Sequence, residues 1–270
     1  MNKFNQKNVV ITGGSTGIGL AIAKEFAAQG AKLFLIARDY AKLQEAQALL
    51  KKNYSGATVE IFALDVADAT AVRAAMNEIG TKHGGIDVLI SNAGILRCGR
   101  FTDQSDEDLA YTLQVNYLGA ANTVRAAWPF LEKSGGQIGI VSSVAGYVGL
   151  IGYGSYSPSK FALVGLAEVL RMEGADKGIK TTIIYPADTE TPQLEYERAH
   201  TLPETMALSK NASIFKPEQI ASKLIRGMEK GKFDVYCNFE SRLIRSLRAI
   251  WPGMFFSSVD GIVAKSRKGK

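Results

Sequence analysis

Hydrophobic positions in this chain fall into short continuous runs that alternate with longer stretches of helical spacing. Short runs rich in β-branched residues and bounded by turn residues are typical of buried strands, whereas apolar residues three and four apart are typical of helices. The runs predict strands at 8–12, 31–37, 58–66, 86–94, 135–143, 179–186 and 232–237. The intervening stretches predict helices at 19–30, 40–52, 69–84, about 105–132, from about 154 or 155 to 172, and 217–230.

This alternation defines the expected fold class. Strands that are apolar throughout and separated by helices favour a parallel sheet covered on both faces. We therefore expect an α/β, Rossmann-type, doubly wound sheet in one domain over 1–237. The polar segment 187–216 is longer than an ordinary connection, so it is predicted to be a substrate lid or an insertion. Residues 238–270 are expected to form a C-terminal extension.

Composition narrows the class of protein without identifying it. The chain has 270 residues, of which 46% are hydrophobic, enough for a large core. It has no uncharged apolar run of membrane-spanning length and no apolar leader after its first residues. Cys98, Cys237 and the two histidines form no metal-binding spacing, so no metal is expected. We expect a cytoplasmic protein.

The positive charge is concentrated at the C-terminal end. The formal net charge is +6, and residues 240–270, with seven basic and two acidic side chains, contribute +5 of it. A uniform nucleic-acid-binding surface is therefore not expected. Residues 241–256 have apolar and arginine positions on different faces of one predicted basic amphipathic helix, which suits a membrane surface at the cytoplasmic face. A helix that packs on the domain or on a second subunit fits the pattern nearly as well.

A glycine-rich turn between the first predicted strand and helix is the first chemical signal. The turn reads TGGSTGIG, and Gly13, Gly17 and Gly19 allow a tight turn that a phosphate can approach. The following helix offers unpaired N–H groups and the positive end of its dipole. Such turns also occur for packing alone, but their position after the first strand favours a dinucleotide. The contacts would come from Gly13, Ser15, Thr16, Gly17, Ile18 and Gly19.

The end of the second predicted strand indicates which dinucleotide is bound. It reads LIARD, which places Arg38 where an acidic residue would hold the ribose hydroxyls of NADH. An arginine suits the 2′-phosphate of NADPH. Asp39 either contacts the ribose or caps the next helix, and capping is the simpler role. We expect NADPH/NADP+ in preference to NADH.

Further motifs follow in a fixed order along the chain. Taken together they resemble the short-chain dehydrogenase/reductase family over the chain up to about residue 237. The motifs are TGxxxGxG at 12–19, Asp65-Val66, Asn92-Ala93-Gly94, Asn116, Ser143 and Tyr156-xxx-Lys160.

The resemblance implies a catalytic group. Tyr156 would donate a proton to a ketone oxygen, and Lys160, at i+4 on the same helical face, would lower the pKa of the phenol and hold the nicotinamide ribose. Ser143 would hydrogen-bond the substrate oxygen. Asn116 would support a water that leads to the lysine. Each of these residues could instead have only a structural role, but the order and spacing of the motifs favour the catalytic interpretation.

The resemblance also implies cofactor contacts beyond the glycine-rich turn. Asp65 would accept a hydrogen bond from the adenine amino group, with capping of the helix that begins near Ala69 as its alternative. Other contacts would come from Val66, Asn92, Ala93, Gly94, Pro186 and Thr189, in addition to Tyr156 and Lys160.

One position departs from the family pattern. Ala187 occupies the place where the family usually has glycine, in YPADTETP. This leaves open the local turn geometry and whether Thr189 or Thr191 faces the cofactor.

The segments YPADTETPQLEYE, LPET, FKPEQIA and SSVAGYVGLIGYGSYSPSKFAL are similar to the subgroup that reduces 3-ketodihydrosphingosine, an early step in sphingolipid synthesis. We therefore expect an apolar keto-lipid substrate. Ser143 and Tyr156 would contact the reacting group, and Tyr147 and Tyr153 would be walls of the pocket.

Other readings remain open at the level of sequence. A reductase of 3-oxoacyl groups on a carrier protein, or of small ketones or steroids, shares the same motifs. A dinucleotide-sensing protein without catalysis is a different class, but such proteins tend to lose the tyrosine or lysine. The family resemblance also implies a homodimer or homotetramer that pairs through helices at about 105–132 and 157–173.

Overall fold

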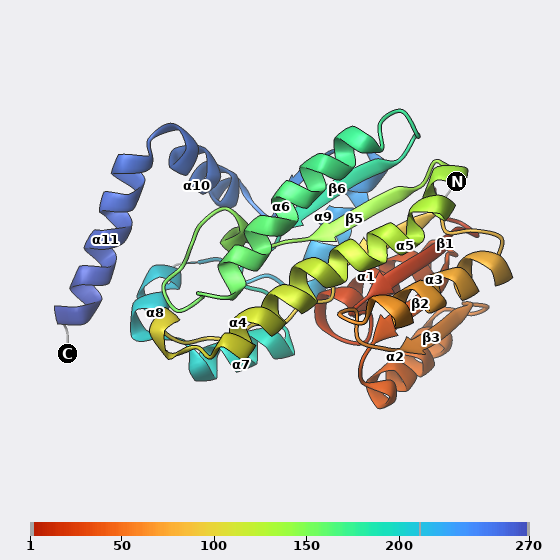
Figure 1. Ribbon diagram of the computed structural model, residues 1–270, viewed down its shortest axis with the longest axis horizontal. Coiled ribbons are helices and arrows are strands. Elements are labelled where there is room, and N and C mark those ends of the chain that lie inside the picture. Colours follow the sequence, from red (N-terminus) through yellow and green to blue (C-terminus); the bar gives the residue numbers. More distant parts are fainter. Residues whose placement is uncertain (1–2, 211, 269–270) are drawn as a thin grey trace.

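One seven-stranded parallel sheet organises the chain, and the computed structural model describes residues 3–210 and 212–268 (Figure 1). The strand order is β3-β2-β1-β4-β5-β6-β7. The strands are β1 (Asn8–Thr12), β2 (Lys32–Ala37), β3 (Val59–Ala63), β4 (Val88–Ser91), β5 (Gln137–Val141), β6 (Lys180–Tyr185) and β7 (Asp234–Tyr236). The order reverses beside β1, so a crevice opens where β1 and β4 diverge, as expected for a doubly wound sheet.

The predicted strands are all present, but several are shorter than the apolar runs that predicted them. The runs 58–66 and 86–94 form ladder pairs only over β3 and β4. Their last residues leave the sheet at its carboxyl edge. This shortening matters for function, because residues 64–66 and 92–94 turn into the crevice instead of extending the sheet.

Helices cover both faces of the sheet. On one face are α1 (Gly17–Ala28), α2 (Tyr40–Asn53) and α9 (Pro217–Glu229), and their apolar sides join one buried cluster. On the other face are α3 (Ala69–Lys82), α5 (Gly119–Ser134) and α6 (Tyr156–Glu173), which join a second buried cluster. The five central strands β2, β1, β4, β5 and β6 are mostly buried between these layers, as their apolar runs predict, whereas the edge strands β3 and β7 are partly exposed.

The long helical region predicted at about 105–132 is interrupted. It consists of α4 (Asp106–Leu113), one π-helical turn η2 (Gln114–Leu118) and α5. A π turn holds an extra residue, so it rotates the side chains that follow relative to those before it. Periodicity over the whole stretch does not reveal such a local change.

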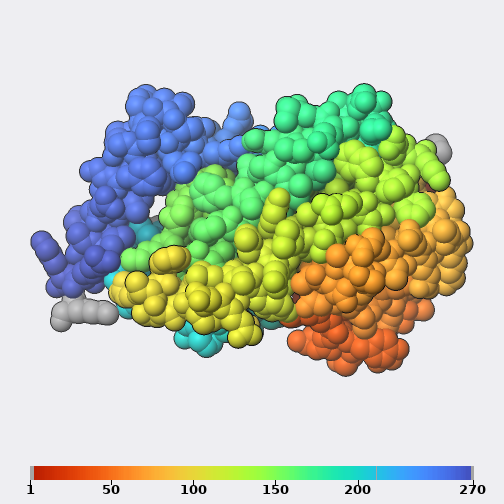
Figure 2. All heavy atoms as spheres, in the orientation of Figure 1, coloured from red at the N-terminus to blue at the C-terminus, as the bar shows by residue number. Residues whose placement is uncertain are grey.

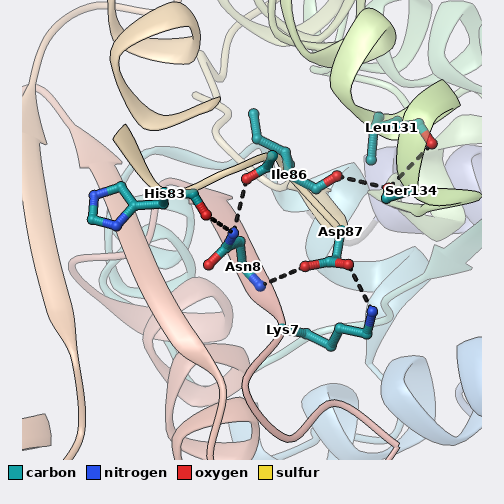
Figure 3. Close-up of polar contacts among 8 residues, drawn as sticks. Lys7, Asn8, His83, Ile86, Asp87, Leu131 and Ser134 are labelled. Carbon is teal, nitrogen blue, oxygen red and sulfur yellow. Dashed lines mark hydrogen bonds and ion pairs between the residues drawn. The ribbon is translucent and has the colours of Figure 1, made fainter. Parts of the chain in front are cut away.

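The amino ends of β1 and β4 are joined by polar contacts, far from the crevice (Figure 3). Asp87 accepts from the Lys7 ammonium at 2.8 Å and from the Asn8 backbone N–H at 2.9 Å. The Asn8 amide donates to the carbonyls of His83 and Gly85, at 3.0 and 2.9 Å. These contacts fix the loop before β4 against the start of β1.

The segment 187–216 contains two short helices, α7 (Pro192–His200) and α8 (Pro203–Ser209). Both begin at a proline, which is favourable in the first turn of a helix because its missing N–H would be unpaired there anyway. Short 3₁₀ turns, η1 (Phe101–Asp103) and η3 (Val144–Gly146), complete the loops at this edge.

The C-terminal segment forms two helices, α10 (Phe239–Ile250) and α11 (Pro252–Lys268). The prediction of one helix through 256 is wrong at Trp251, where φ is −129° and ψ is 63°. Pro252 disfavours helical geometry in the residue before it and has no N–H to donate. Figures 1 and 2 show the pair as an arm at one end of the molecule, with an opening between the arm and the body.

Ion pairs contribute to the attachment of the arm: Arg245 of α10 pairs with Asp234 at 2.8 Å, and Arg267 of α11 pairs with Glu204 of α8 at 3.3 Å. Glu204 also accepts from Arg100 at 2.8 Å. Arg100 lowers the pKa of the Glu204 carboxyl. Across the described ranges 3–210 and 212–268, no helix combines the length and apolarity needed to cross a bilayer.

Candidate active site

A cavity of about 680 Å³ lies at the carboxyl edge of the sheet. Its walls come from the glycine-rich turn, the ends of β2, β4, β5 and β6, the lid helices and the C-terminal arm. Parallel strands place their carboxyl ends at the same edge, so residues far apart in sequence meet there. Most of the sequence-predicted site residues border this cavity.

The glycine-rich turn has the geometry that a phosphate site requires. Gly13 and Gly17 have φ values of +66° and +53°, which favour glycine. A Cβ on Gly19 would lie 2.0 Å from the Gly13 carbonyl oxygen. The first turn of α1 has no acidic residue, and Thr16, its N-cap, makes no side-chain capping bond. The helix therefore directs free N–H groups and a positive dipole end at the cavity, which fits a pyrophosphate.

Arg38 and Asp65 lie together at the far end of this turn, joined by a residue that sequence reasoning missed. The Tyr111 hydroxyl accepts from Arg38 and donates to Asp65 at 2.8 Å. The Arg38 side chain is 54% exposed, so a ligand phosphate can reach it. Tyr111 precedes the π turn in α4, and no spacing signal connects it with residues 38 or 65.

The contacts of the acidic residues in this region show which of them cap helices. Asp39 caps α2, accepting from the Lys42 N–H at 3.1 Å. Asp68 caps α3, so the capping role considered for Asp65 belongs to Asp68. Asp65 instead accepts from the Ala67 N–H at 2.9 Å. Asp65 and Val66 both border the cavity.

The segment after β4 connects the glycine-rich turn to the catalytic group. The Asn92 amide donates to the carbonyl oxygens of Thr12 and Gly13, at 3.0 and 3.2 Å. A Cβ on Gly94 would lie 3.2 Å from the Asn116 amide oxygen and 3.3 Å from the Lys160 ammonium. A glycine is thus needed for this close approach.

Tyr156, Lys160 and Ser143 share the cavity wall. Tyr156 is the first residue of α6, after the N-cap Ser155, and this start agrees with the helix predicted from Gly154 or Ser155. The Lys160 ammonium lies 5.6 Å from the centre of the Tyr156 ring and donates to the Val141 carbonyl at 3.1 Å. Ser143 follows β5 and accepts from the Ala145 N–H at 3.1 Å.

Burial dominates the acid–base properties of this group. Desolvation raises the pKa of Tyr156 to about 12, although the Ser143 and Gln193 side chains act in the opposite direction. Desolvation lowers the pKa of Lys160 to about 8. In the protein without cofactor, burial dominates the pKa of the Tyr156 phenol. The expectation that Lys160 lowers this pKa stays a prediction. The phenol is protonated at neutral pH, the state that a proton donor needs.

Asn116 lies in the π turn η2 and is fully buried. Its amide oxygen accepts from the Ile95 N–H at 2.7 Å, and its amide nitrogen donates to the Ile95 carbonyl and to the Ser159 hydroxyl, both at 2.9 Å. Asn116 therefore fixes the loop after β4 against α6. The π turn supplies the local rotation that the predicted continuous helix lacks.

The two tyrosines predicted as pocket walls have different positions. Tyr153 borders the cavity, packs edge-on against Tyr156 with ring centres 5.7 Å apart, and donates its hydroxyl to Glu197 of α7. Tyr147 is not among the residues that border the cavity: its hydroxyl donates to the Ser241 carbonyl at 2.9 Å. The expectation for Tyr147 is corrected, because its side chain supports α10 instead.

The connection after β6 also borders the cavity. The Pro186 carbonyl accepts from the Val144 N–H at 3.0 Å. Within the described ranges Gln6 is the one non-glycine residue with positive φ, so alanine at 187 is accommodated without left-handed backbone. Thr189 and Thr191 both reach the cavity; the methyl group of Thr191 lies opposite Gly17, where an added Cβ would be 3.1 Å away.

Apolar side chains also border the cavity. They come from the flank of η3, from α8 and from the C-terminal arm: Val148, Leu150, Leu208, Ile244, Phe255 and Ile262. The same helices contribute polar residues, among them Thr205, Ser209 and Ser241. The arm thus contributes a wall to the cavity, a role that its sequence pattern did not reveal. In the part of the chain that the structure describes, no three His, Cys, Asp or Glu side chains converge as a metal site would need.

The fold and the site together define a dinucleotide-binding oxidoreductase class, and comparison with known proteins specifies the family. The model of the short chain dehydrogenase family matches residues 7–201. The chain belongs to this family of oxidoreductases.

Several relatives are more specific. The chain is 38% identical over 245 residues to the 3-dehydrosphinganine reductase TSC10A of Arabidopsis thaliana, covering 89% of this chain and 74% of that one. It is 36% identical over 244 residues to the 3-ketodihydrosphingosine reductase of Bos taurus, with the same coverage.

Solved structures agree with the fold. A short-chain dehydrogenase of Burkholderia cenocepacia J2315 in complex with NADP is 30% identical, with a TM-score of 0.78 over 87% of this chain and 97% of that chain. A family member of Burkholderia phymatum in complex with NAD has a TM-score of 0.83 and 25% identity over 92% of this chain and 95% of that chain. Both nicotinamide dinucleotides thus occur among its structural neighbours.

Proposed function

We propose that this protein is an NADPH-dependent ketoreductase that converts 3-ketodihydrosphingosine to dihydrosphingosine. The relatives named 3-dehydrosphinganine reductase and 3-ketodihydrosphingosine reductase support this choice of substrate. The observation that carries the proposal is the lining of the cavity, which combines Ser143, Tyr156 and Lys160 with apolar side chains from the flank of η3, from α8 and from the arm. A substrate with a keto head and a long alkyl chain matches both sets of residues.

The residues at the polar end have complementary tasks. Ser143 hydrogen-bonds the keto oxygen and stabilises the charge that develops on it. Tyr156 donates the proton that completes the alcohol. Lys160 holds the nicotinamide ribose, and its positive charge stabilises the phenolate left on Tyr156. Asn116 keeps the loop after β4 in place beside them. When bound, NADPH supplies the hydride.

The preference for NADPH rests on Arg38. Its guanidinium follows β2, where a 2′-phosphate would lie, and the neighbouring Asp39, which also borders the cavity, caps α2. The glycine-rich turn and the free N–H groups of α1 would hold the pyrophosphate, and Asp65 and Val66 the adenine. The ratio of kcat/KM for NADPH and NADH measures this preference; a ratio in favour of NADH would contradict it.

A substrate comparison tests the main proposal. Purified protein is assayed for NADPH oxidation with 3-ketodihydrosphingosine, an acetoacetyl thioester and a small cyclic ketone. We expect kcat/KM to be highest with the sphingoid ketone, because the two other compounds lack a long alkyl chain to cover the apolar side chains of the cavity. A higher value with the thioester would favour a 3-oxoacyl reductase.

Two further surfaces extend the proposal. The arm exposes apolar side chains beside its arginines, including Ile250, Trp251, Met254 and Phe256, and we propose that they contact an anionic membrane surface. Trp251→Ser with Met254→Ser should reduce sedimentation with phosphatidylserine vesicles. Unchanged sedimentation would leave the arm as a cavity wall alone.

The helical segment α4–η2–α5 and helix α6 expose apolar side chains as well: Leu113 in α4, Leu118 in η2, and Val169 and Met172 in α6. We propose a homodimer or homotetramer that pairs through these helices. Met172→Glu should shift the sedimentation coefficient toward that of a monomer.

A further inference from the structure

Three carboxylates that border the cavity have no role in the chemistry described above; Glu240 is exposed, whereas Glu197 and Asp188 are partly buried. Glu197 projects from α7 and Asp188 lies in the connection after β6, and both border the cavity that contains Tyr156. Neither forms an ion pair within 4 Å in the ranges 3–210 and 212–268. Arg198, which is exposed on α7, is the cation that acts on both from a distance.

The reduction of a neutral ketone does not need these two negative charges, and their partial burial costs free energy. Burial raises the pKa of both carboxyls, since the protein withdraws them from water without an opposite charge beside them. Both also contribute to the raised pKa of Tyr156. A bound neutral ketone would leave the two carboxylates without an opposite charge, whereas a bound cationic substrate would supply one.

Of the two, Glu197 is connected more directly to the reacting group. Its carboxylate accepts the hydroxyl of Tyr153, and the Tyr153 ring packs edge-on against Tyr156. The carboxylate is thereby held in one orientation, one side chain away from the proton donor. Its second oxygen makes no hydrogen bond within the described ranges.

We propose that Glu197 binds a substrate ammonium group located next to the keto group that Tyr156 protonates. The inference rests on the proposed function, because 3-ketodihydrosphingosine has its amino group on the carbon next to the keto carbon. An ammonium there lies within a few ångströms of the keto oxygen, so a carboxylate near the proton donor is the group that can pair with it. Glu197 is then a specificity-determining residue that selects amino ketones over neutral ketones.

The test compares two substrates in two variants. The substrates are 3-ketodihydrosphingosine and its desamino analogue, which has the same chain and keto alcohol without the nitrogen. Glu197→Gln keeps the shape and an acceptor for Tyr153 but removes the charge. Glu195→Gln is the matched control, because Glu195 is exposed on the same helix and does not border the cavity.

We expect Glu197→Gln to reduce the ratio of kcat/KM for the amino ketone to that for the desamino ketone by about tenfold or more, since charge-assisted hydrogen bonds are lost for one substrate alone. Most of the change should appear in KM. Glu195→Gln should leave the ratio at its wild-type value. Dihydrosphingosine should inhibit desamino-ketone reduction more strongly in the wild type than in Glu197→Gln.

Three outcomes would overturn the inference. Equal losses on both substrates would assign Glu197 a structural role. If the ratio of kcat/KM for the amino ketone to that for the desamino ketone falls in Asp188→Asn but not in Glu197→Gln, Asp188 is the carboxylate that binds the ammonium. If the wild type reduces the desamino ketone and not the amino ketone, the proposed function fails together with this inference; the first two outcomes leave the proposed function intact.

Discussion

At the amino ends of β1 and β4, charged and polar groups bind one another, whereas at the carboxyl ends of the same strands they face a cavity. Asp87 has two donors, from Lys7 and the Asn8 backbone (Figure 3). At the opposite edge, the Lys160 ammonium is buried and donates to the Val141 carbonyl. Glu197 shares its carboxylate with a neutral phenol.

The difference separates groups that stabilise the fold from groups held ready for ligands. Buried ionic groups without partners reduce stability, so a protein retains them where a bound molecule completes the pairing. The amino edge therefore should respond to substitution through stability and the carboxyl edge through activity. The predictions below test this separation, from the largest expected effect to the smallest.

Tyr156→Phe should give the largest change. It removes one hydroxyl from the carboxyl edge, and kcat for ketone reduction should fall by about 10²- to 10⁴-fold, the range of general acid catalysis. The melting temperature should change little, because the ring and its packing on Tyr153 remain. Steady-state kinetics and thermal unfolding measure the two effects. Retained turnover would remove Tyr156 from its proposed role.

Arg38→Ala should come second. The KM for NADPH should rise by about tenfold to a hundredfold, since a charge-assisted contact with the 2′-phosphate is lost. The KM for NADH should stay within about twofold, because NADH has no such phosphate. Loss of equal size with both cofactors would instead indicate that Arg38 acts through Tyr111 and Asp65 on the shape of the adenosine site.

The parallel sheet was readable from the sequence because its strands are buried on both faces. Runs such as NVVIT and KLFLIA are continuous in apolar residues and correspond to β1 and β2. The dinucleotide turn was readable for a related reason: Gly13 and Gly17 need positive φ, which restricts the residue type. Tyr156 and Lys160 were readable because a fixed spacing within one helix places them together.

The remaining features depend on contacts between distant segments. Tyr147 has a hydroxyl and a position like those of Tyr153, but only the packing of α10 reveals that it bonds Ser241. Tyr111 joins Arg38 to Asp65 across separate elements. Likewise, Glu197 lies two residues after Glu195 in the same lid helix, and nothing in the local sequence distinguishes the two carboxylates.

Asp87→Ala tests the amino edge. It leaves the Asn8 N–H and the Lys7 ammonium without their acceptor, which should reduce the free energy of unfolding by about 1–3 kcal/mol. The melting temperature should fall by several degrees, at roughly 2–4 °C per kcal/mol for a chain of this size class. The kcat at 25 °C should remain within about twofold of the wild type.

Lys7→Met is its control. It removes only an ion pair whose lysine side chain is 47% exposed, so the loss should be under about 1 kcal/mol. A large loss of kcat in Asp87→Ala at a temperature where the protein is folded would break the separation between the two edges.

The last effect concerns the pH dependence of stability at the carboxyl edge. Burial lowers the pKa of Lys160 to about 8 in the folded protein, below the 10.5 of an unperturbed lysine. Between these values the unfolded chain binds more protons than the folded one, so stability rises with pH through that window. Below about pH 8 the folded protein has the full cost of a buried charge.

Lys160→Met has no such charge, so without cofactor its melting temperature relative to the wild type should be highest near pH 7. That difference should narrow as the pH is raised from 8 to 10, as measured by thermal unfolding of both proteins in the same buffers. A difference that stays constant with pH would mean that Lys160 is not desolvated in the free protein, and that its charge is accommodated at this edge as fully as that of Lys7 is at the other.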